Sequence, residues 1–454
     1  MPMSRPSQPC MVRGNRRCRR RSIGPCDVAP PSRDADSLAR MSAPPSGASG
    51  PGVPPERTPR RALLVAVLGA MSAFGPMSMD FYLPGMPRLA DELGAGDSLA
   101  QATMAVCMLG LAVGQLVVGP WSDRVGRRLP LLIGVALFAV ASVGCAFAPT
   151  IEVLLAVRFV QGVGGAAGLV VARAIVRDLY SGAAAARTFS RLMLVIGISP
   201  ILAPVLGGAL LAWTDWRGLF LILGAVGVLL FVLAMLVVPD TLGAARHEAG
   251  GVRALRRQVA SVLAHRQFML LVLATGVNQG VLFAFIQMSS LVYQREYGLD
   301  EQTFALAFAI NSVGMLIVSQ INGSIVSRFA PARIMVVSVS TALVSSALVV
   351  VGAALALPLL AIAVVLFVAV SMHGASMPNL SALALEPFAR GAGLASAFIG
   401  CAQFFIGGLV PVVASLAGTS MLTMGVTMTA CAVLALALAL LARRVGPAGE
   451  PAAP

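Results

Sequence analysis

Long apolar stretches alternate with short polar breaks from Ala62 almost to the end of this 454-residue chain. Each stretch is close to the ~20 residues that a helix needs to cross the ~30 Å hydrocarbon core of a bilayer. Because backbone polar groups must be satisfied inside the bilayer, helices are expected rather than strands. The pattern predicts an all-α membrane protein with twelve transmembrane helices, over residues 62–83, 100–120, 129–148, 151–172, 188–212, 217–238, 268–292, 302–326, 333–353, 357–378, 392–413 and 420–442.

The same pattern divides the chain into parts. Residues 1–61 are rich in Pro, Ser, Gly and Arg and predict a disordered leader, and 443–454 predict a short disordered tail. The long basic link 240–267 predicts a cytoplasmic linker along the membrane surface. It separates two six-helix halves, 62–239 and 268–442.

The two halves are weakly similar in sequence, which indicates pseudo-repeats. The repeat relates Gln115, Ser122 and Arg128 to Gln320, Ser327 and Arg333. Transporters built from such repeats bind their substrate near the midplane between the halves.

Composition supports a lipid environment. The chain is 57% hydrophobic and only 11% charged, whereas soluble domains carry about 25% charged residues. Its net charge of +14 could indicate a nucleic-acid partner, but the arginines are spread among short loops. Counted by alternate loops, nearly all fall on one side, and the other side holds Arg88, Arg217 and Arg295. The positive-inside rule predicts a multi-pass protein of the inner (plasma) membrane with both termini in the cytoplasm and no nucleic-acid partner.

Other chemistries have little material in this sequence. There is no Walker A motif for ATP, and residues 162–165 lie inside a predicted span, where a dinucleotide fingerprint does not belong. Only His247, His265 and His373 occur, and the cysteines lack the paired spacing of zinc sites. We therefore expect no enzyme activity, no metal and no cofactor, with a proton gradient as the energy source and a monomeric state.

Asp80 and Arg158 are the clearest ionisable residues within the apolar spans. A charge at membrane depth costs at least ~2.5 kcal/mol, so it indicates function. Both residues are expected in the outer half of the membrane. Burial and a nearby arginine act in opposite directions on a carboxylate, which suits an acid that loads and unloads a proton. We therefore expect Asp80 to carry the proton and Arg158 to tune it; a fixed ion pair that only joins two helices is the alternative.

Prolines and small residues mark two further positions. Pro84 and Pro87 predict that the first helix ends or kinks just after Asp80. Residues 197–208 (GISPILAPVLGG) predict either a bent seam between the halves or ordinary tight packing. Polar residues within the spans line a cavity or hydrogen-bond to neighbouring helices, and the cavity candidates are Tyr82, Gln161, Asn278, Gln279, Gln287, Asn311 and Gln403.

Several motifs resemble those of the major facilitator superfamily. Residues 119–128 (GPWSDRVGRR) resemble its motif A, and 156–162 (AVRFVQG) resemble motif B. Residues 197–208 resemble motif C of drug exporters, with Ala203-Pro204 where many members have Gly-Pro. Residues 79–87 (MDFYLPGMP), with 177–180 (RDLY) and Trp216-Arg217, are similar to the Bcr/CflA-type bicyclomycin-resistance drug:H⁺ antiporters.

The resemblance implies roles for individual residues. Asp80 and Arg158 would couple transport to protons. Motif A would control conformation through Gly119, Asp123, Arg124, Gly126, Arg127 and Arg128. In that motif Gly119 would allow close approach between the halves, and Asp123 would contact a nearby arginine and the start of the eleventh helix, where a helix N-terminus attracts a carboxylate. Motif C would supply Gly197, Pro200, Pro204, Gly207 and Gly208.

The resulting prediction is a proton-coupled multidrug or antibiotic exporter that works by alternating access. Its partners would be a small amphiphilic drug or metabolite, protons and the lipid bilayer. An exporter of a metabolite or amino acid in the same subfamily is the alternative within transport. A transporter-like sensor is the alternative outside it, although a sensor has no need of a proton carrier.

Overall fold

The computed structural model describes residues 59–180, 182–240, 259–260, 262–388 and 392–445. Within these ranges every regular element is a helix, and twelve spans are long and apolar enough to cross a membrane. The all-α membrane fold with twelve spans is therefore confirmed. Nearly all of the predicted leader 1–61, and most of the linker 240–267 and of the tail 443–454, lie outside the described residues.

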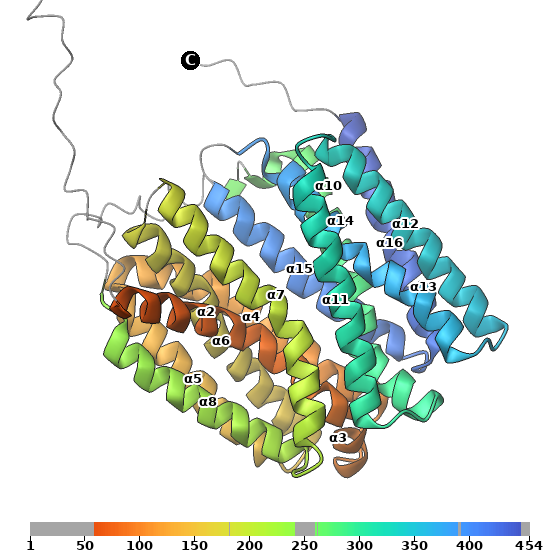
Figure 1. Ribbon diagram of the computed structural model, residues 1–454, viewed down its shortest axis with the longest axis horizontal. Helices are drawn as coiled ribbons and strands as arrows, with labels where there is room; N and C mark the ends of the chain where they lie inside the picture. The colour runs from red at the N-terminus through yellow and green to blue at the C-terminus, as the bar shows by residue number, and fades with distance from the viewer. Residues whose placement is uncertain (1–58, 181, 241–258, 261, 389–391, 446–454) are drawn as a thin grey trace, which may run out of the picture. The chain divides into compact units, whose positions relative to one another are not determined.

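Six spans form the first half of the structure (Figure 1). Its elements are α2 (Pro59–Asp80), η1 (Leu83–Gly85), α3 (Met86–Glu92), α4 (Asp97–Val125), α5 (Arg128–Ala146), α6 (Ile151–Leu179), α7 (Gly182–Leu210) and α8 (Trp216–Val237).

Six more spans form the second half, drawn from green to blue in Figure 1. Its elements are α10 (Arg266–Leu291), η3 (Val292–Glu296), α11 (Glu301–Ile325), α12 (Pro331–Ala354), α13 (Leu359–Ser371), α14 (His373–Leu385), α15 (Ala392–Ser415) and α16 (Met421–Val445). The halves meet along two main seams, α4 against α15 and α7 against α11.

The first span is longer than predicted and is broken inside. It continues past residue 83 as far as Glu92, with α2 ending at Asp80 and η1 and α3 completing it. Pro84 and Pro87 lack the N–H groups that a continuous α-helix would direct at the carbonyls of Asp80 and Leu83. The prolines therefore break the helix and do not end the span.

Two spans of the second half are also irregular. The tenth span is interrupted between Ser371 and His373, and the seventh ends in the π-helical turn η3. Apolar length alone does not predict such features, because they depend on local backbone hydrogen bonding. Turns of this kind occur often at functional sites.

Glycines bring the inner helices of the first half into backbone contact. At the crossing of α4 and α6, a Cβ atom on Gly110 would lie 2.1 Å from the Phe159 carbonyl oxygen. One on Gly162 would lie 2.0 Å from the Cys107 carbonyl oxygen. Only glycine fits at these two positions, and close backbone approach of this kind is how helices associate in lipid.

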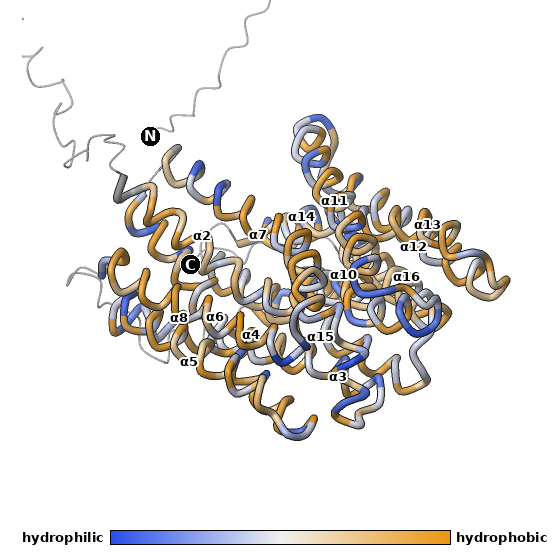
Figure 2. The backbone as a smooth tube through the Cα atoms, turned by 60° about the horizontal axis from the view of Figure 1, so that its bottom comes forward, coloured by the Kyte–Doolittle hydropathy of each residue, from blue (hydrophilic) through white to orange (hydrophobic). Residues whose placement is uncertain are grey.

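The outward surface of the helices is apolar. Val140, Leu236 and Leu360 are each at least 70% exposed, which would be costly in water but suits a lipid solvent. In Figure 2, hydrophobic residues occupy most of the helices, and hydrophilic residues gather toward the helix ends and the connections. The surface therefore fits a multi-pass membrane protein.

The ends of the spans form two chemically different faces. We call the end where α2 begins and α16 ends the basic face; its arginines include Arg60, Arg61, Arg124, Arg127, Arg128, Arg173, Arg177, Arg187, Arg191, Arg266, Arg328, Arg333, Arg443 and Arg444. We call the opposite end the acidic face; it carries Asp91, Glu92, Asp97, Glu152, Asp215, Glu296, Asp300 and Glu301 together with Arg88, Arg217 and Arg295. This asymmetry gives the bundle a direction in the membrane.

Candidate functional site

Asp80 lies at the break of the first span, where α2 ends. Its side chain is only 6% exposed. Within the described part of the chain it has neither a hydrogen-bond partner nor an ion-pair partner. A carboxyl group that is buried without a partner is costly, which sets Asp80 apart from the carboxylates at the two faces.

Arg158 lies in a different environment, fully buried in the first half. Its Nη1 donates to the Gln161 Oε1 at 2.6 Å and its Nε to the Thr103 carbonyl oxygen at 3.3 Å. The guanidinium carbon lies 4.6 Å from the centre of the Tyr82 ring and 5.5 Å from that of Phe220. Cation–π contacts of this kind are favourable when desolvated.

The buried network extends from Arg158 into its neighbours. The hydroxyl groups of Tyr82 and Thr103 share a hydrogen bond of 2.8 Å, and Gln161 Nε2 donates to Ser142 Oγ at 2.7 Å. The Arg158 Nη2 is buried without a partner in the described residues. Tyr82 and Gln161, proposed from the sequence as cavity residues, therefore belong to this buried network.

No ion pair joins Asp80 to Arg158 among the described residues. The fixed-pair alternative is therefore not realised in this structure. Instead, Arg158 packs over Tyr82, two residues beyond Asp80, so the arginine contacts the same broken segment that carries the acid.

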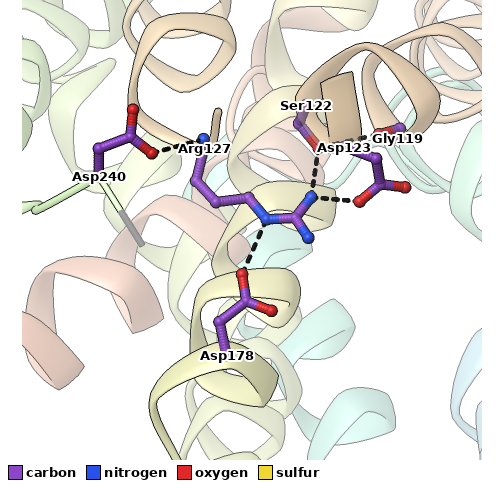
Figure 3. Close-up of polar contacts among 6 residues, drawn as sticks. All are labelled: Gly119, Ser122, Asp123, Arg127, Asp178 and Asp240. Carbon is purple, nitrogen blue, oxygen red and sulfur yellow. Dashed lines mark hydrogen bonds and ion pairs between the residues drawn. The ribbon is translucent and has the colours of Figure 1, made fainter. Parts of the chain in front are cut away.

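Motif A is organised around Arg127 at the basic face (Figure 3). The Arg127 side chain is only 4% exposed. It donates from Nε to Asp178 at 2.9 Å, and from Nη1 to Asp123 at 2.5 Å and Ser122 at 3.0 Å, as Figure 3 shows. Its backbone N–H donates to Asp240 Oδ1 at 3.1 Å. The two ion pairs and this backbone hydrogen bond join the ends of α4 and α6 to the segment that follows α8.

The environment of Arg127 keeps its charge. Burial by itself would lower the pKa of the guanidinium, but the hydrogen bonds to Asp178 and Asp123 outweigh burial and raise the pKa.

The residue before Arg127, Gly126, has a φ of 102°. A Cβ atom there would lie 2.5 Å from Asp240 Oδ2. Glycine is therefore required on both conformational and steric grounds.

The other motif A residues are placed differently from one another. Asp123 contacts Arg127, as the resemblance implied, and within the described residues it does not reach the start of α15. Gly119 has Val170 of its own half as its nearest neighbour, at an ordinary 3.8 Å from an added Cβ. Arg124 is exposed, and Arg128 donates to the Met235 carbonyl oxygen at 2.6 Å. In this conformation motif A is therefore bonded within the first half.

Motif C lies in α7 along the seam with α11. Pro204 lacks the N–H that would bond the Pro200 carbonyl in a regular helix. Ser312 of α11 donates its hydroxyl to that carbonyl at 3.2 Å. A Cβ added at Gly197 would have Leu316 as its nearest neighbour, at 3.7 Å. Motif C therefore forms part of a seam between the halves.

The paired glycines of motif C touch two different partners. A Cβ on Gly207 would lie 1.9 Å from the Phe81 carbonyl oxygen, in the break after Asp80. A Cβ on Gly208 would lie 3.0 Å from Ala305 Cβ, on α11 of the other half. These two glycines therefore place the broken segment of the first span against the interface.

The acidic face holds a set of contacts that the sequence did not predict. Arg88 pairs with Glu301, and Arg295 pairs with both Asp91 and Asp97. Four hydrogen bonds accompany these three ion pairs: Ser290 to the Leu83 carbonyl, Gln294 to the Pro84 carbonyl, Ser98 to the Ser415 carbonyl, and Gln101 to Thr419. We call the ion pairs and hydrogen bonds together the acidic-face seal. All of them cross between the halves.

Sequence reasoning missed these residues because charges at loop ends usually only contact solvent. The available signal was Pro87, which removes the donor for the Leu83 carbonyl and so leaves it open to Ser290. Trp216-Arg217 also lies at this face. Trp216 Nε1 donates to Glu92 at 2.8 Å, and Arg217 donates to the Ala146 and Ala148 carbonyls.

Two of the polar candidates of the second half, Asn278 and Gln287, are hydrogen-bonded to neighbouring helices. Asn278 donates to Ser376 at 3.1 Å and contacts His373 across the α13–α14 interruption. Gln287 donates to the Gly408 carbonyl at 3.2 Å, and Asn311 donates within its own helix to the Ala307 carbonyl. Gln279 and Gln403 are half-buried. The role of these residues in lining a cavity stays a prediction.

Comparison with known proteins identifies the family. The family model described as Major Facilitator Superfamily matches residues 66–411. The chain belongs to the major facilitator superfamily. It is a secondary transporter of small molecules and not an enzyme.

The similar proteins include an uncharacterised transporter and a protein named for drug resistance. It is 35% identical to an uncharacterised MFS-type transporter, YdgK, of Bacillus subtilis (strain 168), with 82% of this chain and 94% of that protein covered. It is 29% identical to a bicyclomycin resistance protein homolog of Haemophilus influenzae (strain ATCC 51907 / DSM 11121 / KW20 / Rd), with the same coverage.

The fold is similar to solved transporter structures. A bacterial homolog of the human lysosomal transporter Spinster, in an inward-facing and occupied conformation, matches with a TM-score of 0.69. The two chains are 15% identical, and the match covers 86% of this chain and 98% of that one. This similarity establishes the fold alone.

Proposed function

We propose that this transporter exports small amphiphilic compounds, including antibiotics, in exchange for protons by alternating access. The observation that carries the proposal is Asp80. It is a buried carboxyl without a partner in the described residues, and it lies at a helix break beside the interface between the halves. An acid in such a setting is a candidate proton carrier.

The orientation in the membrane and the closed side are proposed from the two faces. The arginines concentrate at the basic face, and the positive-inside rule assigns such a face to the cytoplasm. The contacts between the halves gather at the acidic face. We therefore propose that the structure represents a state closed toward the outside, with both ends of the chain on the cytoplasmic side.

The substrate class is proposed from the relatives. The bicyclomycin resistance homolog of Haemophilus influenzae is named for antibiotic resistance. The methionine-rich and phenylalanine-rich interior, with Met104 and Met108 fully or nearly buried, suits ligands of varied shape, because methionine adapts to irregular surfaces.

Proton counter-transport is the direct test. Inside-out vesicles containing the protein are energised so that their lumen becomes acidic, and a panel of antibiotics is added while a pH-sensitive dye is monitored. We expect a substrate to release luminal protons from vesicles with the unaltered protein and not from vesicles with Asp80→Asn. The neutral amide cannot carry a proton.

Asp215→Asn is the matched control. Asp215 lies exposed at the acidic face, outside the spans, and its Oδ1 accepts the Gly218 N–H at the start of α8, at 2.8 Å. An amide oxygen preserves that cap, so substrate-driven proton release should be unchanged. Proton release that persists in Asp80→Asn would show that Asp80 is not the carrier.

A further inference from the structure

The break after Asp80 is held from the second half by two polar side chains of the seventh span. Ser290 donates its hydroxyl to the Leu83 carbonyl. Gln294 Nε2 donates to the Pro84 carbonyl at 3.0 Å and to Ser290 Oγ at 3.0 Å. The two donors therefore act as one unit on the residues that follow the acid.

The chain is built so that these bonds can form. Pro87 lacks the N–H that a regular helix would give to the Leu83 carbonyl, so this oxygen accepts from the Met86 N–H and from Ser290. Gln294 belongs to the π-helical turn η3. A π-helical turn changes the direction in which its side chains point relative to an α-helix, and such turns are frequent at functional sites.

The start of the same segment is in contact with α7. Gly207 lies so close to the Phe81 carbonyl oxygen that a Cβ would approach it to 1.9 Å. The break is thus confined between motif C of its own half and Ser290 and Gln294 of the other half. Asp80 itself, at the edge of this segment, has no partner in the described residues that would fix it independently.

We propose that Ser290 and Gln294 are positioning residues for proton exchange at Asp80, because they tie the shape of the break to closure of the acidic face. The inference rests on the proposed function and adds the link between the acid and the seal. When the halves separate at the acidic face, the carbonyls of Leu83 and Pro84 lose these donors and the segment beside Asp80 is released. When the halves close, the same bonds return the segment to the arrangement seen here.

Through this link, protonation of Asp80 and opening of the acidic-face seal become coupled equilibria. A two-state contact that both sites bias is the physical requirement for such coupling. A charged carboxylate is costly to bury without a partner, so the charged form favours release of the segment. A neutral side chain favours the closed arrangement.

The coupling can be measured with a cysteine reporter under the seal. Ala305 is 3% exposed and faces Gly208 across the interface. Ala305→Cys is placed in a variant whose native cysteines are replaced, and its labelling by a membrane-impermeant maleimide is followed from the acidic face. We expect Asp80→Asn to slow labelling by about fivefold or more, the size of a typical coupling between sites.

Removing the link should cancel that response. In a protein that carries both Ser290→Ala and Gln294→Leu, we expect faster labelling and the same rate with or without Asp80→Asn. Ser290→Thr, which keeps the hydroxyl donor, should restore the response when Gln294 is intact. In the variants that lose the response to Asp80→Asn, the labelling rate should also depend less on pH. A merely structural defect would not produce this change.

Gln101→Leu is the matched control. Gln101 also donates across the halves at the acidic face, to Thr419 at 3.0 Å, and among the described residues it has no hydrogen bond to the break. It should accelerate labelling and leave the effect of Asp80→Asn intact. Additive effects of Asp80→Asn with Ser290→Ala and Gln294→Leu would overturn the inference.

The outcomes also separate this inference from the proposed function. If Asp80→Asn abolishes substrate-driven proton release but does not alter labelling, the exchange function stands and the link to the seal is wrong. If Asp80→Asn changes neither proton release nor labelling, both proposals are wrong.

Discussion

The two faces of this transporter are held together in different ways. At the basic face, the Arg127 side chain bonds to Asp123 and Asp178 of the first half, and its backbone N–H bonds to Asp240 just after that half. At the acidic face, Arg295 bonds to Asp91 and Asp97, which belong to the opposite half. The same chemistry, an arginine between carboxylates, therefore stabilises one half at one face and joins two halves at the other.

Burial separates the two clusters as clearly as connectivity does. The Arg127 side chain is 4% exposed and that of Arg295 is 38% exposed. Buried pairs are strongly destabilising to break, whereas exposed pairs contribute little each. The arginine of the basic face is therefore held in a buried site, whereas the arginine of the acidic face makes more exposed and weaker pairs, as the proposed opening and closing of that face requires.

The largest expected effect comes from breaking the basic-face cluster. Arg127→Gln should lower the free energy of unfolding by ~3 kcal/mol or more, because it breaks the ion pair between Arg127 and the carboxylate of Asp178, whose side chains are each 4% exposed. The measurement is thermal unfolding of the detergent-purified protein. The neighbouring Arg124, which is exposed, serves as the control, and Arg124→Gln should unfold within a few degrees of the unaltered protein. Equal unfolding temperatures for both variants would contradict the comparison.

An intermediate effect is expected at the contact between motif C and the break. Gly207→Ala forces a carbon onto the Phe81 carbonyl, and overpacking of this kind costs ~1–3 kcal/mol. Transport should fall more than the amount of folded protein, because the strain falls on the segment beside Asp80. Gly197→Ala is the control on the same helix, since its nearest neighbour would lie 3.7 Å away. Loss of transport in both variants to the same extent would argue against a special role for Gly207.

The smallest expected effect concerns the exposed pairs of the acidic face. Arg295→Gln removes two ion pairs that should contribute ~0.2–1 kcal/mol each, and this contribution should be screened by salt. Labelling of Ala305→Cys from the acidic face should become faster, and added salt should accelerate it less than in the unaltered protein. A labelling rate that is insensitive both to the variant and to salt would show that these pairs do not hold the face closed.

Much of the architecture was predictable because the bilayer constrains it. The twelve spans follow from apolar length alone, and the break after Asp80 follows from Pro84 and Pro87. The motif A residues were also identified in advance, and so was the contact of Asp123 with a nearby arginine, but the partners from other helices were not. Asp178 and Asp240 lie far from Arg127 along the chain, and only the packing of α6 and α8 against α4 and α5 brings them together.

Some expectations depended on conformation and so could not be read from residues. The resemblance implied that Asp123 would reach the eleventh helix and that Gly119 would allow the halves to approach. In this structure, Asp123 bonds to Arg127 and Gly119 has its nearest contact within its own half. A motif specifies which groups are available, but the relative placement of the two halves decides which of them meet.

The sequence by itself determined the number of spans, the asymmetry of charge and the position of an acid inside the first span. These properties depend on local length, composition and proline chemistry, which each segment carries alone. Only the tertiary structure decided that the acid has no ion pair with Arg158, that Gly207 contacts the break, and that Ser290 and Gln294 hold it from the other half. Such contacts join residues far apart in the chain, and they form only when separate helices pack in one particular arrangement.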